Sequence, residues 1–289
     1  MLFNFPKDKV KQKLALLLYS NPGQGKSVSI CTLLKIPNLK VRILATERNC
    51  IPAIEEGMRI HGIKELTKGQ LVIAEARGTA QISSDNFMAN SDSTAYDAAV
   101  ARLFSFTGID VFDGSEINLG KVFSWGDDCV LVIDGMTMLQ HAATGKGQKK
   151  SEDEGTTKDP RNAFYNTQKL FIGYIVQLIN NSKIHIVALG HSVVELDEKV
   201  LAKIKDTGVT KIHPYLGTRS IIDGILSQFN VLLYAKYNKL TRKYVWSADE
   251  TDAMTVARNI QIEGNLYEGK PVKLSSLPAD FSYSGYNFF

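Results

Sequence analysis

The stretch SNPGQGKS, residues 20–27, places a lysine and a serine directly after a turn that contains two glycines. Glycines let the backbone turn its N–H groups toward an anion, and a helix that begins at the lysine directs its positive end there. The P-loop pattern G-x-x-x-x-G-K-[ST] is met at its last three positions, with Ser20 in place of the first glycine. The alternative is a Gly/Pro turn with an exposed lysine. The candidate nucleotide-binding residues are Asn21, Pro22, Gly23, Gln24, Gly25, Lys26, Ser27 and Val28.

A P-loop needs a metal and a second carboxylate. Lys26 would reach the β- and γ-phosphates of ATP, and Ser27 would bind Mg²⁺. Asp134 closes the apolar run CVLVIDG, residues 129–135, which is typical of a strand buried on both faces of a parallel sheet. Ligands of such sheets bind at the carboxyl ends of the strands, so Asp134 is the second candidate metal ligand. The alternative is an aspartate that only ends a strand at a turn.

Two further polar residues end apolar runs. Glu47 closes VRILATE and could polarise an attacking water, provided that its strand neighbours the first one. His191 closes IHIVALGH and could hydrogen-bond the γ-phosphate and report its loss to the following loop. We therefore count Lys26, Glu47, Asp134 and His191 as candidate catalytic residues. The alternatives are a solvated glutamate at a loop start and a histidine satisfied at a strand end.

The elements that position these residues alternate between strands and helices. This order predicts an α/β fold with a mostly parallel central sheet and helices on both faces. The segments 141–161 and 193–219 read as long loops, and 275–289 as an aromatic tail with little helix or strand signal. Expected strands are 13–20, 40–47, 69–76, 129–135, 183–192 and a hairpin-like pair at 230–239 and 243–249; expected helices are 25–36, 51–63, 91–108, 160–182 and 220–229.

Composition narrows the class of protein. The 289 residues carry 34 basic and 30 acidic side chains, a net charge of +4, which permits a local nucleic-acid patch without arguing for one. The three cysteines, none in a CxxC pair, favour reduced core thiols. The first residues lack the order of a signal peptide, and no apolar run reaches the length of a membrane span. We expect a cytoplasmic protein without membrane contact.

With these elements in this order, residues 13–240 resemble the RecA-like P-loop ATPases. The likeness is closest to the phage core-only RecA-like ATPases associated with single-strand annealing and recombination. It rests on NPGQGKS, on Glu47 after the second strand, on the long segment after Asp134, and on His191, where RecA has a glutamine. It divides the chain into a RecA-like core, 1–240, and a C-terminal strand and aromatic tail, 241–289.

The resemblance implies Mg²⁺-dependent ATP hydrolysis on single-stranded DNA in recombination or replication, by a ring or filament of identical subunits. An annealing or single-strand-binding protein would be a further partner. Two other functions stay open: a helicase or DNA-packaging motor, and a nucleotide-binding regulator or adaptor that does not act as a motor. By similarity, 141–161 and 193–216 would line the DNA path, although Glu152, Asp153 and Glu154 interrupt the basic residues. The implied DNA contacts are Lys146, Lys149, Lys150, Lys158 and Arg161, and the residues implied to act in trans are Arg219, Lys236 and Lys239.

Overall fold

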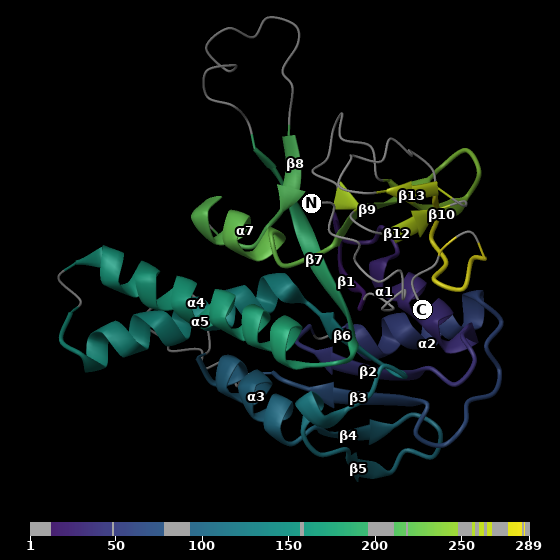
Figure 1. Ribbon diagram of the computed structural model, residues 1–289, viewed down its shortest axis with the longest axis horizontal. Coiled ribbons are helices and arrows are strands. Elements are labelled where there is room, and N and C mark those ends of the chain that lie inside the picture. Colours follow the sequence, from purple (N-terminus) through teal and green to yellow (C-terminus); the bar gives the residue numbers. More distant parts are fainter. Residues whose placement is uncertain are drawn as a thin grey trace, which may run out of the picture.

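A computed structural model provides the structure of the protein. It describes residues 13–47, 49–77, 93–156, 159–195, 211–217, 219–247, 256–257, 260–262, 265–267, 277–284 and 286. In this part of the chain, no helix has the length and apolar composition that crossing a bilayer requires. Figure 1 shows the arrangement of the elements.

A mostly parallel sheet forms the centre of the protein. Its ten strands follow the order β14-β10-β9-β1-β7-β6-β2-β3-β4-β5, and β8 and β11 pair with it at the side. The six strands from β9 to β3 run parallel, whereas the strands at both edges pair antiparallel. The strands are β1 Ala15–Ser20, β2 Lys40–Ala45, β3 Leu71–Glu75, β4 Thr107–Asp110, β5 Glu116–Asn118, β6 Cys129–Asp134, β7 His185–Glu195, β8 Lys211–Pro214, β9 Val231–Asn238, β10 Lys243–Ser247, β11 Val256–Ala257, and β14 Leu277–Pro278; β12 Ile260–Ile262 and β13 Asn265–Tyr267 form a separate pair.

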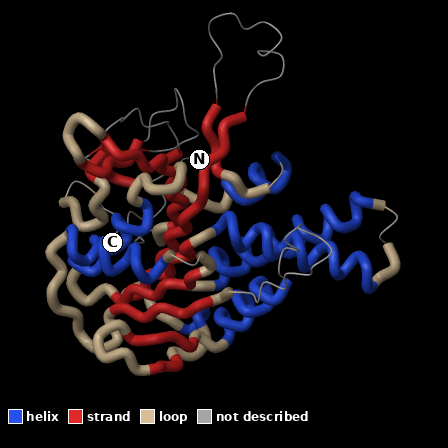
Figure 2. The backbone as a smooth tube through the Cα atoms, turned by 180° about the vertical axis from the view of Figure 1, so that it is seen from behind, coloured by secondary structure: helices blue, strands red, loops and turns tan. Residues whose placement is uncertain are grey.

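Helices cover both faces of the sheet, as Figure 2 shows. One hydrophobic core lies between the sheet and the helices α1 and α2, and a second lies between the sheet and α3, α4, α5 and α7. The central strands have apolar side chains on both faces because both faces are buried. The helices are α1 Lys26–Ile30, continued by the 3₁₀ turn Cys31–Lys35, α2 Cys50–Ile60, α3 Ser93–Phe104, α4 Met136–Asp153, α5 Pro160–Asn181 and α7 Arg219–Leu226, with a second 3₁₀ turn at Val122–Ser124.

The expected α/β class, the parallel sheet and most of the central elements are confirmed. The helix expected over 91–108 is wrong at its end, because α3 stops at Phe104 and residues 107–110 form strand β4. Gly108 allows this strand to pair closely with β3, since a Cβ on Gly108 would lie 2.6 Å from the carbonyl oxygen of Ile73. The antiparallel edge of β4 and β5 was not expected.

The loop expected over 141–161 is also wrong. Residues up to Asp153 continue helix α4, which packs against α5 as a helical hairpin. Small residues make the packing possible: a Cβ on Gly147 would lie 2.5 Å from Thr167 Oγ1 and 3.0 Å from the carbonyl oxygen of Ala163 on α5. Gly147, one of the glycines that suggested a loop, therefore serves close contact between two helices.

The segment 193–219, expected as a second loop, is partly strand. Beyond His191, which pairs with Ser20 of β1, strand β7 continues to Glu195 and pairs antiparallel with β8. Figure 1 shows this β7–β8 arm standing out from the body of the protein. Residues 196–210 lie outside the described part of the chain.

The described part of the C-terminal tail packs against the body. The Phe281 ring lies edge-on to Trp246, with ring centroids 4.7 Å apart, and Tyr286 stacks on the same indole at 5.8 Å. The Phe281 N–H donates to Thr32 Oγ1 at 2.8 Å. Phe281 and Tyr286 are buried, so these rings belong to the core beside α1.

Candidate functional site

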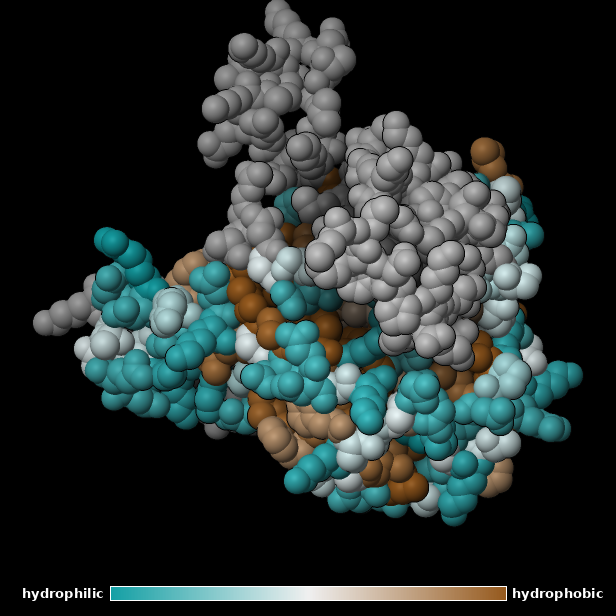
Figure 3. All heavy atoms as spheres, in the orientation of Figure 1, coloured by the Kyte–Doolittle hydropathy of each residue, from teal (hydrophilic) through white to brown (hydrophobic). Residues whose placement is uncertain are grey.

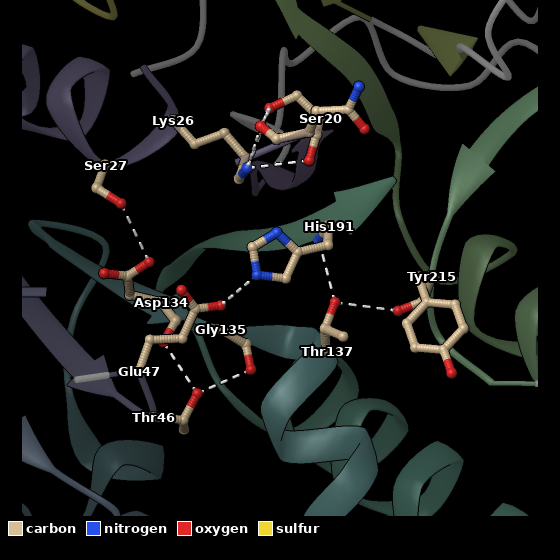
Figure 4. Close-up of polar contacts among 11 residues, drawn as sticks. Ser20, Lys26, Ser27, Thr46, Glu47, Asp134, Gly135, Thr137, His191 and Tyr215 are labelled. Carbon is tan, nitrogen blue, oxygen red and sulfur yellow. Dashed lines mark hydrogen bonds and ion pairs between the residues drawn. The ribbon is translucent and has the colours of Figure 1, made fainter. Parts of the chain in front are cut away.

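Residues from four separate segments meet at the carboxyl ends of the parallel strands. Lys26, Ser27, Glu47, Asp134 and His191 line one pocket of about 260 Å³. Figure 4 shows the His191 ring between the Glu47 carboxylate and Lys26. Strand β7 carries His191 and lies between β1 and β6, which brings the histidine between the turn after β1 and the aspartate that ends β6.

The turn after β1 has the backbone that its glycines predict. Gly23 and Gly25 adopt positive φ angles of 76° and 83°, which other residues rarely reach. Lys26 Nζ lies within hydrogen-bonding distance of the Ser20 carbonyl at 3.1 Å and of Ser20 Oγ at 3.0 Å. Ser20, which replaces the first glycine of the pattern, therefore contacts the lysine. Burial lowers the pKa of Lys26 to about 8, although Glu47 and Asp134 pull it upward.

Two residues of the predicted phosphate-binding stretch make contacts with neighbouring elements. Asn21 Oδ1 accepts a hydrogen bond from Ser192 Oγ at 2.6 Å, at the base of the β7–β8 arm. Gln24 Oε1 accepts one from the Tyr237 N–H at 2.8 Å, on β9. The stretch is thus hydrogen-bonded to both strands that neighbour β1 in the sheet, β7 and β9.

Asp134 lies at the bottom of the pocket and is 4% exposed. Ser27 Oγ donates to its Oδ1 at 3.3 Å, and the Cys50 thiol donates a further hydrogen bond. Burial raises the pKa of Asp134, and these hydrogen bonds oppose the rise. A buried carboxylate beside a serine hydroxyl gives two hard oxygen donors, the kind that Mg²⁺ prefers.

Glu47 reaches the pocket by a route that differs from the expected one. Strand β2 does not neighbour β1, because β7 and β6 lie between them. Glu47 lies two residues beyond β2 and packs on Gly135, where a Cβ would lie 2.6 Å from Glu47 Cγ. Thr46 joins the segment after β2 to the end of β6, since its hydroxyl lies 2.9 Å from the Asp134 carbonyl oxygen and 2.8 Å from the Gly135 carbonyl oxygen.

His191 connects Glu47 to the β7–β8 arm. Its Nε2 lies 3.1 Å from Glu47 Oε1, and this hydrogen bond holds the pKa of Glu47 below its usual value. The backbone N–H of His191 donates to Thr137 Oγ1 at 3.0 Å, and the Thr137 hydroxyl donates to the backbone carbonyl of Tyr215 at 3.1 Å. Tyr215 directly follows β8. Within the described residues, His191 Nδ1 is buried without a hydrogen-bond partner.

No group of three or more His, Cys, Asp or Glu side chains that could hold a metal occurs in the described ranges. Mg²⁺ does not require one, because it is commonly bound through one or two protein oxygens together with substrate phosphates and water. Ser27 and Asp134 have that chemistry.

The residues expected to contact DNA lie elsewhere. Lys146 and Lys150 sit on helix α4, where they pair with Asp97 at 2.7 Å and with Glu154 at 3.8 Å. Lys149 is exposed on the same helix, and Arg161 lies near the start of α5 with Asp159 at 3.5 Å. Lys158 is outside the described residues.

The three residues expected to act in trans belong to two elements. Arg219 begins α7, and its side chain is not described. Lys236 lies on β9, and Lys239 follows β9 in the turn toward β10.

Several residues of the pocket and its support were not expected from the sequence, among them the five that follow. Gly135 had the clearest signal, because an Asp-Gly pair at a strand end indicates a turn with positive φ, here 111°. Thr46, Cys50 and Thr137 adjoin predicted residues, but only the strand order shows what they contact. Tyr244, from β10, lines the pocket from more than two hundred residues beyond the turn after β1.

Comparison of the sequence with models of known protein families gives no match, and comparison with curated proteins gives none either. The geometry of the pocket is therefore the basis for assigning a function.

Proposed function

We propose that the protein is a Mg²⁺-dependent ATPase of the RecA-like P-loop kind. The observation that carries this proposal is the convergence of Lys26, Ser27, Glu47, Asp134 and His191 on one pocket at the carboxyl ends of parallel strands. In open α/β sheets this edge is where ligands bind. Gly23 and Gly25, which have positive φ angles as an anion-binding turn requires, line the same pocket.

Each residue has a role in the attack of water on the γ-phosphate. Lys26 is a cation within the phosphate cradle, and Ser27 and Asp134 would hold the metal. When bound, Mg²⁺ would neutralise charge on the β- and γ-phosphate oxygens. Glu47 accepts a hydrogen bond from the attacking water, a role that its lowered pKa supports because the carboxylate stays ionised at neutral pH. His191 holds Glu47 by donating from Nε2–H, and only with both ring nitrogens protonated would it also donate from Nδ1 to a phosphate oxygen.

We propose single-stranded DNA and further copies of the chain as partners, on the resemblance to recombination ATPases. The contact series from Glu47 through His191 and Thr137 to Tyr215 supports coupling between the pocket and the β7–β8 arm. The lysines of α4 give this proposal less support than expected, because two of them are paired with carboxylates. The arm is therefore the favoured place for a partner that responds to hydrolysis.

Phosphate release from ATP, measured with Mg²⁺, with excess EDTA, and with or without single-stranded DNA, tests the proposal. Asp134→Asn should weaken Mg²⁺-dependent ATP binding as well as turnover. Glu47→Gln should bind ATP normally and turn it over at least about tenfold more slowly, since only the positioning of water is lost. Glu116→Gln, at an exposed position on β5, is the matched control and should behave like the wild type.

An ATP-binding titration and a strand-displacement assay, run beside the phosphate-release measurement, separate the rival functions. Tight ATP binding with negligible turnover would indicate a nucleotide-binding regulator. Strand displacement coupled to hydrolysis would indicate a helicase. Full activity in Glu47→Gln with unchanged affinity would remove Glu47 from the mechanism.

A further inference from the structure

The β9–β10 hairpin packs directly against the P-loop. Strand β9 pairs parallel with β1, and β10 pairs antiparallel with β9. Besides the hydrogen bond from Tyr237 to Gln24, the hairpin contributes the ring of Tyr244. Tyr237 and Tyr244 lie opposite each other in the register, with ring centroids 5.1 Å apart and planes inclined at 56°. Figure 1 shows the two strands near α1.

The Tyr244 ring touches the loop at Gly25. A Cβ on Gly25 would lie 2.2 Å from Cδ1 and 2.6 Å from Cγ of this ring, far inside contact distance. Such an approach requires glycine for its missing side chain as well as for its φ of 83°. The ring is therefore held beside the phosphate cradle by the loop and by its neighbour Tyr237.

Tyr244 also faces the pocket. Among the described residues that line the pocket, it is the one Phe, Tyr or Trp, and it lies there with Lys26, Ser27 and Val28 from the loop and the start of α1. The ring is half-buried, so part of its surface is open to a ligand. Pro22, Gly23 and Gly25, which line the pocket from the loop, bring no polar side chain that could read the edge of a base.

We propose that Tyr244 forms the wall against which the base of a bound nucleotide stacks. This inference rests on the proposed function, because Lys26 and Ser27 must first hold the phosphates. Once they do, the sugar and base leave the cradle, and the ring beside Gly25 offers an apolar face for them. Stacking tolerates every base, since each has a π-face. The ligand class is thus a nucleoside triphosphate held by its phosphates and by stacking, with weak discrimination between ATP and GTP.

Inorganic tripolyphosphate separates the base from the phosphates. Isothermal titration calorimetry with ATP and with tripolyphosphate, both in Mg²⁺, gives the affinity that the nucleoside part adds. Tyr244→Leu keeps an apolar side chain against the loop but removes the π-face, and should weaken ATP binding by roughly tenfold. Tripolyphosphate binding should change by less than about twofold, and Tyr244→Phe should bind both compounds as the wild type does. Tyr165→Ala, which removes an exposed tyrosine from α5, is the matched control.

The outcomes are distinguishable. An equal loss of ATP and tripolyphosphate affinity in Tyr244→Leu would show that the ring only shapes the loop, and would overturn the base wall alone. An unchanged affinity for both compounds would overturn it as well, as would a strong preference of the wild type for ATP over GTP. A wild-type protein that binds neither compound would overturn the proposed function, and the base wall with it.

Discussion

Two eight-residue stretches of the chain each combine two glycines with lysine and a final serine: SNPGQGKS at residues 20–27 has one lysine, and TGKGQKKS at residues 144–151 has three. The first forms a turn with two positive φ angles between β1 and α1. The second is a continuous part of helix α4. Two glycines in eight residues therefore do not by themselves predict a turn.

The glycines differ in what they permit. Gly25 permits a left-handed backbone and close contact with Tyr244, whereas Gly147 keeps a helical backbone and permits contact with Thr167 on α5. Ala143, Gly147 and Ser151, four residues apart, are all buried on one side of α4. The lysines differ accordingly: Lys26 is enclosed in the pocket, and Lys149 is exposed on the helix surface. On the face shown in Figure 3, the outer part of the α4–α5 hairpin carries mainly hydrophilic side chains.

The largest effect should separate the two lysines. Lys26→Ala removes a cation from the proposed phosphate-binding turn, and we expect ATP turnover to fall on the order of 100-fold or more. Lys146→Ala loses only a surface pair with Asp97 and should leave turnover unchanged. Steady-state phosphate release measures both. Turnover of Lys26→Ala within about tenfold of the wild type, a loss below roughly 1.4 kcal/mol, would mean that the first stretch is an ordinary turn.

The second effect concerns the glycines of the first stretch. Gly25→Ala must strain the backbone and push Tyr244 away, so we expect ATP affinity to fall by more than about tenfold, a loss of over 1.4 kcal/mol. Gly23→Ala, at a φ of 76° with nothing within 4 Å of the added Cβ, carries the strain alone. Titration calorimetry with ATP measures the affinity of both variants, and the difference between their losses gives the effect of the Tyr244 contact. Equal losses in the two variants would show that the ring does not constrain the loop.

The sequence was sufficient for the elements with continuous apolar runs. Strands β1, β2, β6 and β7 were predicted near their observed positions because burial on both faces leaves a run without alternation. Asp134 and Lys26 followed from where those runs end. The contact between Glu47 and His191 could not be predicted, because it depends on β7 and β6 lying between β1 and β2.

Helix α4 shows why the loop predicted over 141–161 is wrong. Gly, Lys and Thr suggested a loop, since glycine disfavours a helix interior by about 1 kcal/mol. Packing against α5 overcomes this cost, and the only local sign was the four-residue spacing of Ala143, Gly147 and Ser151. The β7–β8 arm was also not predicted from the sequence. Its strands pair over Ser192–Glu195, beyond the part of β7 that is buried in the central sheet.

The third effect tests the packing role of Gly147. In an exposed helix interior, glycine to alanine stabilises by about 0.5–1 kcal/mol. At Gly147 the new Cβ would lie 2.7 Å from the Thr167 nitrogen, so Gly147→Ala should instead lower the free energy of unfolding by about 1–3 kcal/mol. Gly173→Ala, on α5 with nothing within 4 Å, is the control and should stabilise. Urea unfolding measures both, and stabilisation by Gly147→Ala would contradict the close α4–α5 contact.

The smallest effect concerns the lysines of the second stretch. If they bound phosphates of single-stranded DNA, replacing Lys146, Lys149 and Lys150 by alanine would flatten the salt dependence of binding by up to ~0.7 in the log–log slope for each lost contact. Two of the three are paired with carboxylates, and all three lie on a helix away from the pocket. We therefore expect the slope to change by less than one such contact, ~0.7, with basal hydrolysis unchanged. Fluorescence anisotropy with a labelled oligonucleotide at several salt concentrations measures the slope. A decrease near the value for three contacts would return the DNA path to α4, whereas the expected small change leaves the β7–β8 arm as the place to search for it.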